Sequence, residues 1–234
     1  MKTTYYQKCK EHYARFGFGK TMVYLLDRLI NSVILADCYH IIVLDREKVK
    51  EPSAASSPDI SFRFATWDEL VDMRKQETWA IDDFLLDRAA EGDMCFLSFC
   101  GGELAGYTWA NVNGQPLLAS GLRLKLPENY IYNYSGFTLP KFRGSGLQSV
   151  RHRALMHYKQ WGRNMLGFIG YVRYTNWASI SGQTKSGYRR VGRVWLFGSK
   201  KHFMTLRSRE VKDFGIKRIH EFIGADSKRY STAG

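Results

Sequence analysis

The feature that most constrains this chain is a turn with two glycines between an apolar segment and a helical one. Residues Thr138–Leu147 read Thr-Leu-Pro-Lys-Phe-Arg-Gly-Ser-Gly-Leu, which predicts a strand that enters the turn and a helix that leaves it. Glycines at 144 and 146 let backbone N–H groups face a ligand without a Cβ in the way, and a helix N-terminus adds partial positive charge. The turn therefore predicts a phosphate site, although a purely structural tight turn needs the same glycines.

A second segment follows one strand later. It begins at Asn176, where a helix is expected to start, and ends at Gly187 and Tyr188, where that helix is expected to close and a strand to begin. Between the two motifs lies an apolar run, Gly167–Tyr174, typical of a strand.

The remaining pattern alternates between strands and helices. We expect strands at 38–44, 60–65, 94–100, 104–112, 130–139, 167–174 and 188–197, and helices at 5–30, 66–77, 80–90, 146–161 and 176–186. Thr66 and Glu69 fit a capping box at a helix start. This order predicts an α/β or α+β fold with a mixed sheet flanked by helices.

The two motifs, in this order and about thirty residues apart, resemble those of the GNAT superfamily of acyl-CoA-dependent N-acyltransferases. Lys141-Phe-Arg-Gly-Ser-Gly146 matches the family's pyrophosphate-binding turn, and the Asn176 to Tyr188 segment matches its Asn-to-Gly-Phe/Tyr helix. The resemblance covers about residues 60–197. It implies a GNAT-like, mainly antiparallel sheet with two splayed strands, acetyl-CoA or another acyl-CoA as donor, and no metal.

The resemblance also implies where the donor binds. Backbone groups of the splaying strand pair with the pantetheine arm, amides of the turn hold the pyrophosphate, two cations lie close to it, and an asparagine reaches the arm from the next helix. In this chain those positions are Phe137, Leu139, Lys141, Phe142, Arg143, Gly144, Ser145, Gly146, Leu147 and Asn176. A backbone N–H near Phe137 would polarise the acyl carbonyl, and an amine would attack the thioester directly.

The chain departs from the family at the proton-transfer positions. Many members have a Tyr seven residues after the Asn, where this chain has Gln183, and a Glu on the preceding strand would fall near Asn133. In one hypothesis, binding geometry with a hydrogen bond from Gln183 or Ser179 replaces that chemistry, because a thiolate is a tolerable leaving group. Asn133, Ser179 and Gln183 are thus the candidate catalytic residues, and loss of catalysis in a fold that only binds is the alternative.

A general base can still come from the N-terminal half of the domain. The pool is Asp82, Asp83, Asp87, Glu91, Asp93, Glu103 and Glu128. Asp82 and Asp83 lie where an acidic pocket would suit a cationic amine, but we favour the reading that they cap a helix.

The charge is unevenly distributed. The formal net charge is +13, and residues 129–209 contain no Asp or Glu. Such segregation would concentrate a polyanion. The lead hypothesis is therefore a small-molecule amine acceptor with an acyl-CoA donor. The alternatives are a donor carried by acyl carrier protein or aminoacyl-tRNA, and a non-catalytic module with residues 1–50 as a membrane-surface anchor.

The domain organisation follows from composition. Residues 48–59 are rich in Pro, Ser and Ala, which predicts a basic N-terminal extension at 1–50, a linker at 51–59, the GNAT domain at 60–199 and a basic tail at 200–234. Four cysteines without a CxxC spacing predict free, mostly buried thiols, and we expect a cytoplasmic protein without a transmembrane segment. His152 and His157 do not share a helix face, so no metal pair is expected.

Overall fold

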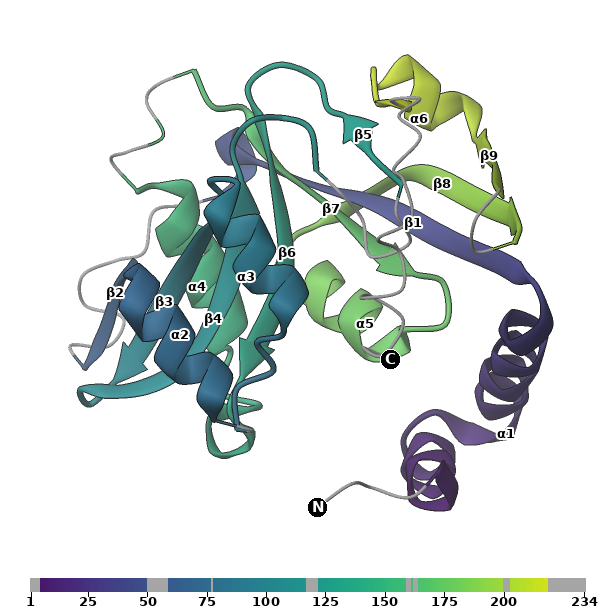
Figure 1. Ribbon diagram of the computed structural model, residues 1–234, viewed down its shortest axis with the longest axis horizontal. Coiled ribbons are helices and arrows are strands. Elements are labelled where there is room, and N and C mark those ends of the chain that lie inside the picture. Colours follow the sequence, from purple (N-terminus) through teal and green to yellow (C-terminus); the bar gives the residue numbers. More distant parts are fainter. Residues whose placement is uncertain are drawn as a thin grey trace.

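The computed structural model describes residues 5–49, 59–76, 78–116, 122–158, 161, 164–199 and 203–218. Its strands form an eight-stranded sheet in the order β2-β3-β4-β6-β7-β1-β8-β9 (Figure 1). The bounds are β1 Leu35–Asp45, β2 Ile60–Phe64, β3 Met94–Cys100, β4 Glu103–Asn111, β6 Tyr130–Thr138, β7 Gly167–Arg173, β8 Arg189–Gly198 and β9 Phe203–Arg207. Neighbouring strands are antiparallel except β6 and β7, which run parallel. The predicted mixed, mainly antiparallel sheet is confirmed.

Helices cover both faces of this sheet. Their bounds are α1 Tyr5–Val33, α2 Trp67–Lys75, α3 Asp83–Ala90, α4 Leu147–Met156, α5 Trp177–Lys185 and α6 Arg209–Asp213, with short 3₁₀ turns η1 Arg46–Lys48 and η3 Pro140–Phe142. A two-stranded ribbon pairs β5, Leu124–Lys125, with β10, Lys217–Arg218. The described residues thus have the flanked sheet of an α+β fold.

Three apolar clusters join the layers. One packs α2 and α3 on β3 and β4 through Leu70, Leu85 and Trp109. A second packs α4 on β1 and β7 through Leu155, Ile42 and Phe168, and a third includes Val211 of α6. The sheet is therefore buried on both faces over most of its width.

Local predictions that depend on short-range chemistry are confirmed. Thr66 caps α2 in a reciprocal capping box with Glu69. Asp82 caps α3 by accepting a hydrogen bond from the Leu85 N–H at 3.0 Å, as the helix-capping reading required. The hairpin β3–β4 turns at Gly101 and Gly102, which both have positive φ.

The N-terminal strand does not belong to a separate extension. β1 lies between β7 and β8 and is antiparallel to both. Its four consecutive apolar residues, 41–44, are all buried, because this strand has a covered sheet face on each side. The predicted division of the chain into a 1–50 extension and a 60–199 domain is corrected accordingly.

The structure describes only parts of the two other predicted segments, the linker and the C-terminal tail. The linker at 51–59 lies outside the described residues except for Asp59, and so do 200–202 and 219–234 of the tail. Residues 203–218 of that tail form β9, α6 and β10, with β9 paired to β8, so this part extends the sheet. It is not a solvated tail.

The cysteines are free, but only Cys95 is buried, while Cys9, Cys38 and Cys100 are partly exposed. The expectation of mostly buried thiols was therefore wrong for three of the four. In the described part of the chain, no helix is both long and apolar enough to cross a membrane.

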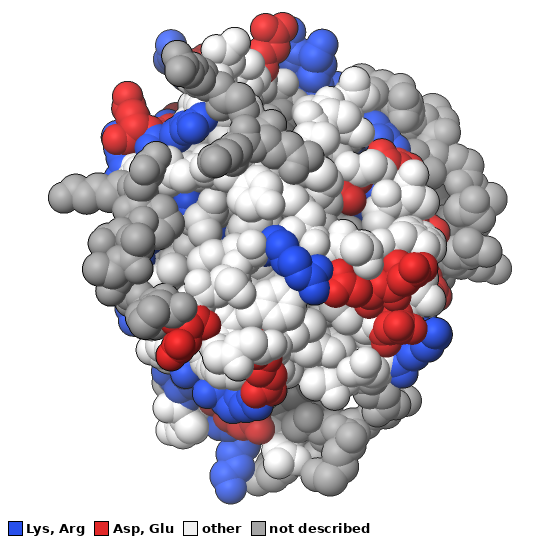
Figure 2. All heavy atoms as spheres, turned by 90° about the vertical axis from the view of Figure 1, so that its left-hand side faces the viewer, with Lys and Arg blue, Asp and Glu red and all other residues white. Residues whose placement is uncertain are grey.

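The face on the side of β2 carries charges of both signs. Figure 2 shows acidic and basic side chains next to one another there, with uncharged surface between the charged groups. This mixture fits the sequence, because the carboxylates of the sheet domain come mainly before residue 129. Residues 129–209, which contain no carboxylate, form the strands β6, β7, β8 and β9 of the other half of the sheet.

Candidate functional site

The two parallel strands part after a short ladder. β6 and β7 pair only at Tyr130–Tyr132 with Gly167–Ile169. A Cβ on Gly170 would lie 3.2 Å from the carbonyl oxygen of Asn133, so glycine allows the close approach at the last point of contact. Beyond it, no strand of the described residues pairs with the β7-facing edge of β6. We call the region between 133–138 and 170–173 the splay.

The far part of β6 is shaped by its pairing with β4. The register shifts between Tyr107 and Trp109, and Ser135 opposite this irregularity has φ 44°. A bulge of this kind re-aims the backbone and increases the local twist. It gives β6 a direction different from that of β7.

The predicted turn follows β6 directly. η3 leads to Gly144 with φ 84° and to Gly146 with φ 77°, which is the N-cap of α4. A Cβ on either glycine would meet no atom within 4 Å, so the space above the turn is open. Among the described residues, the N–H groups of 144–148 find no backbone or side-chain acceptor. Five amides at a helix N-terminus are thus free to bind an anion.

The predicted cations flank this turn and are engaged within the chain. Lys141 forms an ion pair with Glu103, and the Arg143 Nε donates to the carbonyl oxygen of Thr138 at 3.0 Å. Both side chains are exposed. The Ser145 hydroxyl donates to the carbonyl of Phe142 at 2.7 Å and closes the turn from inside.

The two strand residues predicted to pair with a pantetheine arm have their backbone groups engaged. The Leu139 N–H donates to Ala105 at 2.9 Å, and its carbonyl accepts from Phe142 at 2.9 Å. The Phe137 carbonyl faces β4, since it would lie 2.3 Å from a Cβ on Gly106. Because carbonyls alternate along a strand, those of Gly136 and Thr138 point away from β4, and that of Thr138 already accepts the Arg143 Nε–H.

A buried arginine supports this part of β6 from α4. Arg151 is fully buried, and its guanidinium donates to the hydroxyls of Ser98 at 3.1 Å and Thr138 at 3.4 Å. Burial lowers the pKa of Arg151 to about 10, and no carboxylate of the described residues pairs with it. Sequence reasoning missed Arg151, because a cation on an apolar helix face gives no local signal of its partner.

Asn176 has the predicted place at the start of α5. Its Oδ1 accepts the Ser179 N–H at 3.1 Å, which leaves the exposed Nδ2 side for a ligand. Gln148, also missed, lies between β6 and α5. The Gln148 Nε2 lies 3.9 Å from the position that a Cβ on Gly136 would take. The Gln148 Oε1 lies 3.5 Å from the position that a Cβ on Gly182 would take. The turn, β6 and α5 are therefore brought together as the motifs predicted.

Asn133 is a structural link at the point where the strands part. Its Nδ2 donates to Thr108 at 3.0 Å and to the Trp109 carbonyl at 3.1 Å, and its Oδ1 accepts the Tyr188 hydroxyl at 3.3 Å. With both amide hydrogens used, a catalytic role for Asn133 finds no support in these contacts. Tyr188 is buried, which raises its pKa well above the usual value, so the hydroxyl keeps its proton.

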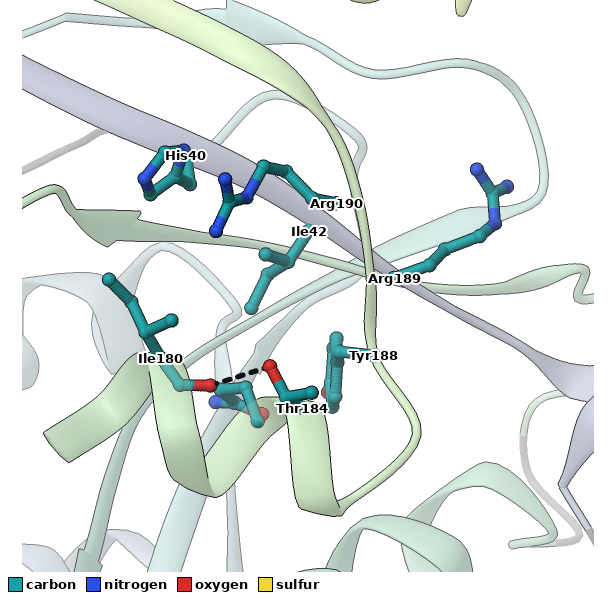
Figure 3. Close-up of a pocket in the computed structure, with 8 residues that line it drawn as sticks. His40, Ile42, Ile180, Thr184, Tyr188, Arg189 and Arg190 are labelled. Atoms are coloured by element: carbon teal, nitrogen blue, oxygen red, sulfur yellow. Dashed lines mark hydrogen bonds between the residues drawn. The ribbon is translucent and has the colours of Figure 1, made fainter. Parts of the chain in front are cut away.

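Gln183 is one of the residues that line a pocket, and Figure 3 shows this pocket with its labelled lining residues, Tyr188 among them. The pocket has a volume of about 370 Å³ between α5 and the strands β1 and β8, and Tyr188 and His40 also line it. Burial, together with Arg190 and Arg193, lowers the pKa of His40 to about 4. Arg189 points away from the pocket and forms an ion pair with Asp45. Ser179 contributes its backbone N–H to the cap and lies one turn before Gln183.

Two of the carboxylates considered as a general base contact β6 or the 3₁₀ turn that follows it. Asp93 is buried and accepts the Tyr134 hydroxyl and the Asn111 amide, each at 2.6 Å, while Glu103 holds Lys141. Burial raises the pKa of Asp93. Among the described residues, no group of three or more His, Cys, Asp or Glu side chains is placed to hold a metal ion.

No protein-family model and no curated protein matches the chain. Solved structures do resemble it. A Drosophila protein is 15% identical, with 77% of this chain and 58% of that one covered and a TM-score of 0.48. A GCN5-related N-acetyltransferase from Kribbella flavida is 10% identical, with 76% and 63% covered and a TM-score of 0.46. A GCN5-related N-acetyltransferase-like protein from Streptococcus suis is 8% identical, with 76% and 67% covered and a TM-score of 0.45. The chain spans about three fifths of the length of the first two.

With every TM-score below 0.5, the fold assignment depends on the chain's own topology. The sheet is mainly antiparallel, with one parallel pair, β6 and β7, whose strands diverge. A glycine turn after β6 leads into helix α4. This topology agrees with the mixed, mainly antiparallel sheet with two splayed strands that the motifs predicted.

Proposed function

We propose that the protein is an N-acyltransferase that takes an acyl group from acyl-CoA, in the first instance acetyl-CoA, and transfers it to the amine of a small molecule. One observation carries this proposal. The N–H groups of 144–148, which have no acceptor among the described residues, lie at a helix N-terminus directly after the open edge of β6. A diphosphate next to an extended amide-bearing arm is the ligand that such a pair of features fits.

Each part of the site would then have one task. The turn amides bind the diphosphate, the β6 edge at Gly136 and Thr138 pairs with the amides of the arm, and Asn176 contacts the arm from α5. This places the thioester near the start of the splay, beside the bulge at Ser135. A backbone N–H there would stabilise the oxyanion as a neutral amine attacks the carbonyl.

The proton for the departing thiolate would come from Tyr188. Its hydroxyl lies at the start of the splay, bonded to Asn133, and burial keeps it protonated. Gln183, at the position where many family members have Tyr, has no proton to give but lines the adjoining pocket. Asp93, held by Tyr134 of β6, is the candidate to receive the amine proton.

Donor binding tests the proposal most directly. Ser145→Glu adds a negative charge at the open turn without changing either glycine, and the side chain is exposed. We expect the affinity for CoA, measured by titration calorimetry, to fall about tenfold or more, which is roughly 1.4 kcal/mol.

Two matched variants make that result specific. Ser145→Ala removes the same hydrogen bond to Phe142 without adding charge, and Ser181→Glu adds the same charge at an exposed position of α5. Both should bind CoA within about twofold of the unmodified chain. Unaltered affinity in Ser145→Glu would place the diphosphate elsewhere and sink the proposal.

A second candidate is a transferase whose donor is carried by acyl carrier protein or aminoacyl-tRNA. The observation that favours it is the run of residues 129–209 without a carboxylate. Donor affinity would then fall steeply with added salt, since each phosphate contact contributes to the slope. A shallow salt dependence with free CoA supports the small donor.

A further inference from the structure

The second half of α1 has its apolar side toward solvent. Gly17, with φ 79° and ψ 177°, interrupts the helix, and residues 18–33 follow as one regular segment. At about 100° per residue, five apolar side chains fall within a stripe about 80° wide, namely Phe18, Met22, Leu26, Leu29 and Val33. Phe18 is 70%, Leu29 65% and Val33 82% exposed.

Further apolar residues widen this stripe. Val23 and Ile30 are also exposed, so the apolar arc widens to about 140°, or about two fifths of the helix circumference. We call the seven residues of this arc the α1 apolar face. Large exposed apolar surfaces of this kind mark interaction sites in soluble proteins.

The polar side of the same segment packs on the protein. Asp27 forms an ion pair with Arg173 at 3.6 Å and accepts the Thr175 hydroxyl at 3.4 Å. Asn31 bonds to the backbone of Ala36 in both directions, and the Lys20 ammonium lies 5.2 Å from the centre of the Trp177 ring. A surface helix ordinarily buries its apolar side and exposes its polar side. α1 does the reverse, so its contacts to the body fix the apolar face outward.

The surroundings extend the apolar surface. At the end of the sheet where α1 joins β1, Phe197 of β8 is the register partner of Ala36, and Met204 of β9 pairs with Phe197. Both side chains are exposed. Figure 1 shows α1 projecting beyond this end of the sheet, where no other described helix covers it.

The width of the face and the charge of the chain indicate what covers it. A two-helix coiled coil needs only a narrow seam, whereas an arc of about 140° suits a broad apolar medium. The segment carries the exposed Arg28, its one carboxylate is paired with Arg173, and the chain as a whole has a charge of +13. Anionic lipid head groups complement that charge.

We propose that the α1 apolar face inserts into the surface layer of a membrane that contains anionic phospholipid, with the sheet held outside it. The helix lies in the plane of the interface and does not cross, in keeping with the absence of a helix able to span a membrane among the described residues. The proposal is independent of the acyl-transfer function, because it uses none of the residues of the turn or the splay.

Vesicle co-sedimentation of the full chain tests it. One set of vesicles is phosphatidylcholine alone and the other contains phosphatidylglycerol. We expect binding to the anionic vesicles, and at least a tenfold weaker binding for the double variant Leu29→Glu, Val33→Glu. Trp67→Glu replaces another exposed apolar residue, on α2, and is the control, with unchanged binding.

The remaining outcomes each decide the question. If the double variant binds the anionic vesicles as tightly as the unmodified chain does, the protein is held on the vesicles by charge alone. That result would overturn the proposal that the α1 apolar face inserts. No vesicle binding, with a dimer in light scattering that the double variant abolishes, would assign the face to a second copy instead. If the double variant fails to fold, Leu29→Trp keeps the face apolar, and quenching of its added fluorescence by brominated lipid reports insertion, while lack of quenching rejects it.

Discussion

The two arms of the splay obtain their support from different parts of the sequence. β6 is held by β4 and α4, which all lie within residues 103–156. β7 is held on its outer side by β1, at residues 35–45, more than a hundred positions earlier. The arm that would receive the donor is thus assembled locally, and the opposite arm depends on the N-terminus of the chain.

The chemistry of the two arms differs as well. β6 is supported by buried hydrogen bonds, from Arg151 to Ser98 and Thr138 and from Asn133 to Thr108. The end of β7 is held by a partly exposed arginine, Arg173, which pairs with Asp37 of β1 and Asp27 of α1. The geometry of the splay therefore needs both a rigid local arm and a remote strand.

Removing the remote strand should have the largest effect. Deletion of residues 1–49 removes β1, whose buried side chains at 41–44 each contribute roughly 1.5–3 kcal/mol. That loss is comparable to the whole stability of a typical domain. We expect no cooperative thermal unfolding transition and no native near-ultraviolet circular dichroism.

A shorter deletion is the control. Removing residues 2–16 takes away only the part of α1 before Gly17 and keeps β1 and Asp27. We expect this chain to unfold cooperatively. A folded 50–234 fragment that binds CoA would show that the β7 arm stands without β1 and would remove the contrast between the arms.

Much of the local arm could be predicted from the sequence, because short-range chemistry determines it. The glycines at 144 and 146 adopt the positive φ that favours glycine, and Asn176 caps α5 as an Asn at a helix start does. The Phe137 carbonyl faces β4, and both backbone groups of Leu139 are engaged within the chain. Which carbonyls face the splay depends on the β4 register and its bulge, and neither is visible in a single strand's sequence.

The remote arm could not be predicted, because strand partners are chosen by tertiary packing. The run Ile41–Leu44 did carry a signal, since consecutive apolar residues are typical of a strand buried on both faces. The composition of 48–59 suggested a boundary instead and outweighed it. The contact between Tyr188 and Asn133 joins residues 55 positions apart and likewise has no local signature.

That contact joins the two halves of the sheet, and removing it should have an intermediate effect. Tyr188→Phe deletes the hydroxyl that bonds to Asn133 and that we propose as proton donor. We expect kcat for acyl transfer to fall by about 100-fold, while CoA affinity stays within about twofold. The free energy of unfolding should fall by about 1–3 kcal/mol, because the buried Asn133 oxygen loses its partner.

A second buried tyrosine separates stability from chemistry. Tyr107 donates its hydroxyl to the Ala80 carbonyl at 2.9 Å, within the apolar cluster that packs α2 and α3 on β3 and β4. Tyr107→Phe should lose similar stability and keep its kcat. If Tyr188→Phe also keeps its kcat, the hydroxyl is purely a tie between the arms, and the thiolate obtains its proton from water.

The smallest effect concerns the histidine that packs against this tie. His152 is buried on α4, with its ring 5.6 Å from that of Tyr188, and burial together with Arg151 lowers its pKa from 6.5 to about 3. The fold therefore favours neutral His152. The stability from this preference is fully present above pH 6.5 and is lost as the pH falls toward 3, because the unfolded chain takes up the proton first.

His152→Phe keeps a ring against Tyr188 and cannot titrate. Measured by urea unfolding from pH 7.5 to 4.5, the difference in free energy between variant and unmodified chain should shift in favour of the variant. We expect a change of up to about 1.4 kcal/mol per pH unit below 6.5. His40, whose pKa is also low, is present in both chains and cancels from the difference. Parallel pH profiles would mean that His152 is solvated or charged in the fold, and that α4 packs less tightly against Tyr188 than the rigid local arm requires.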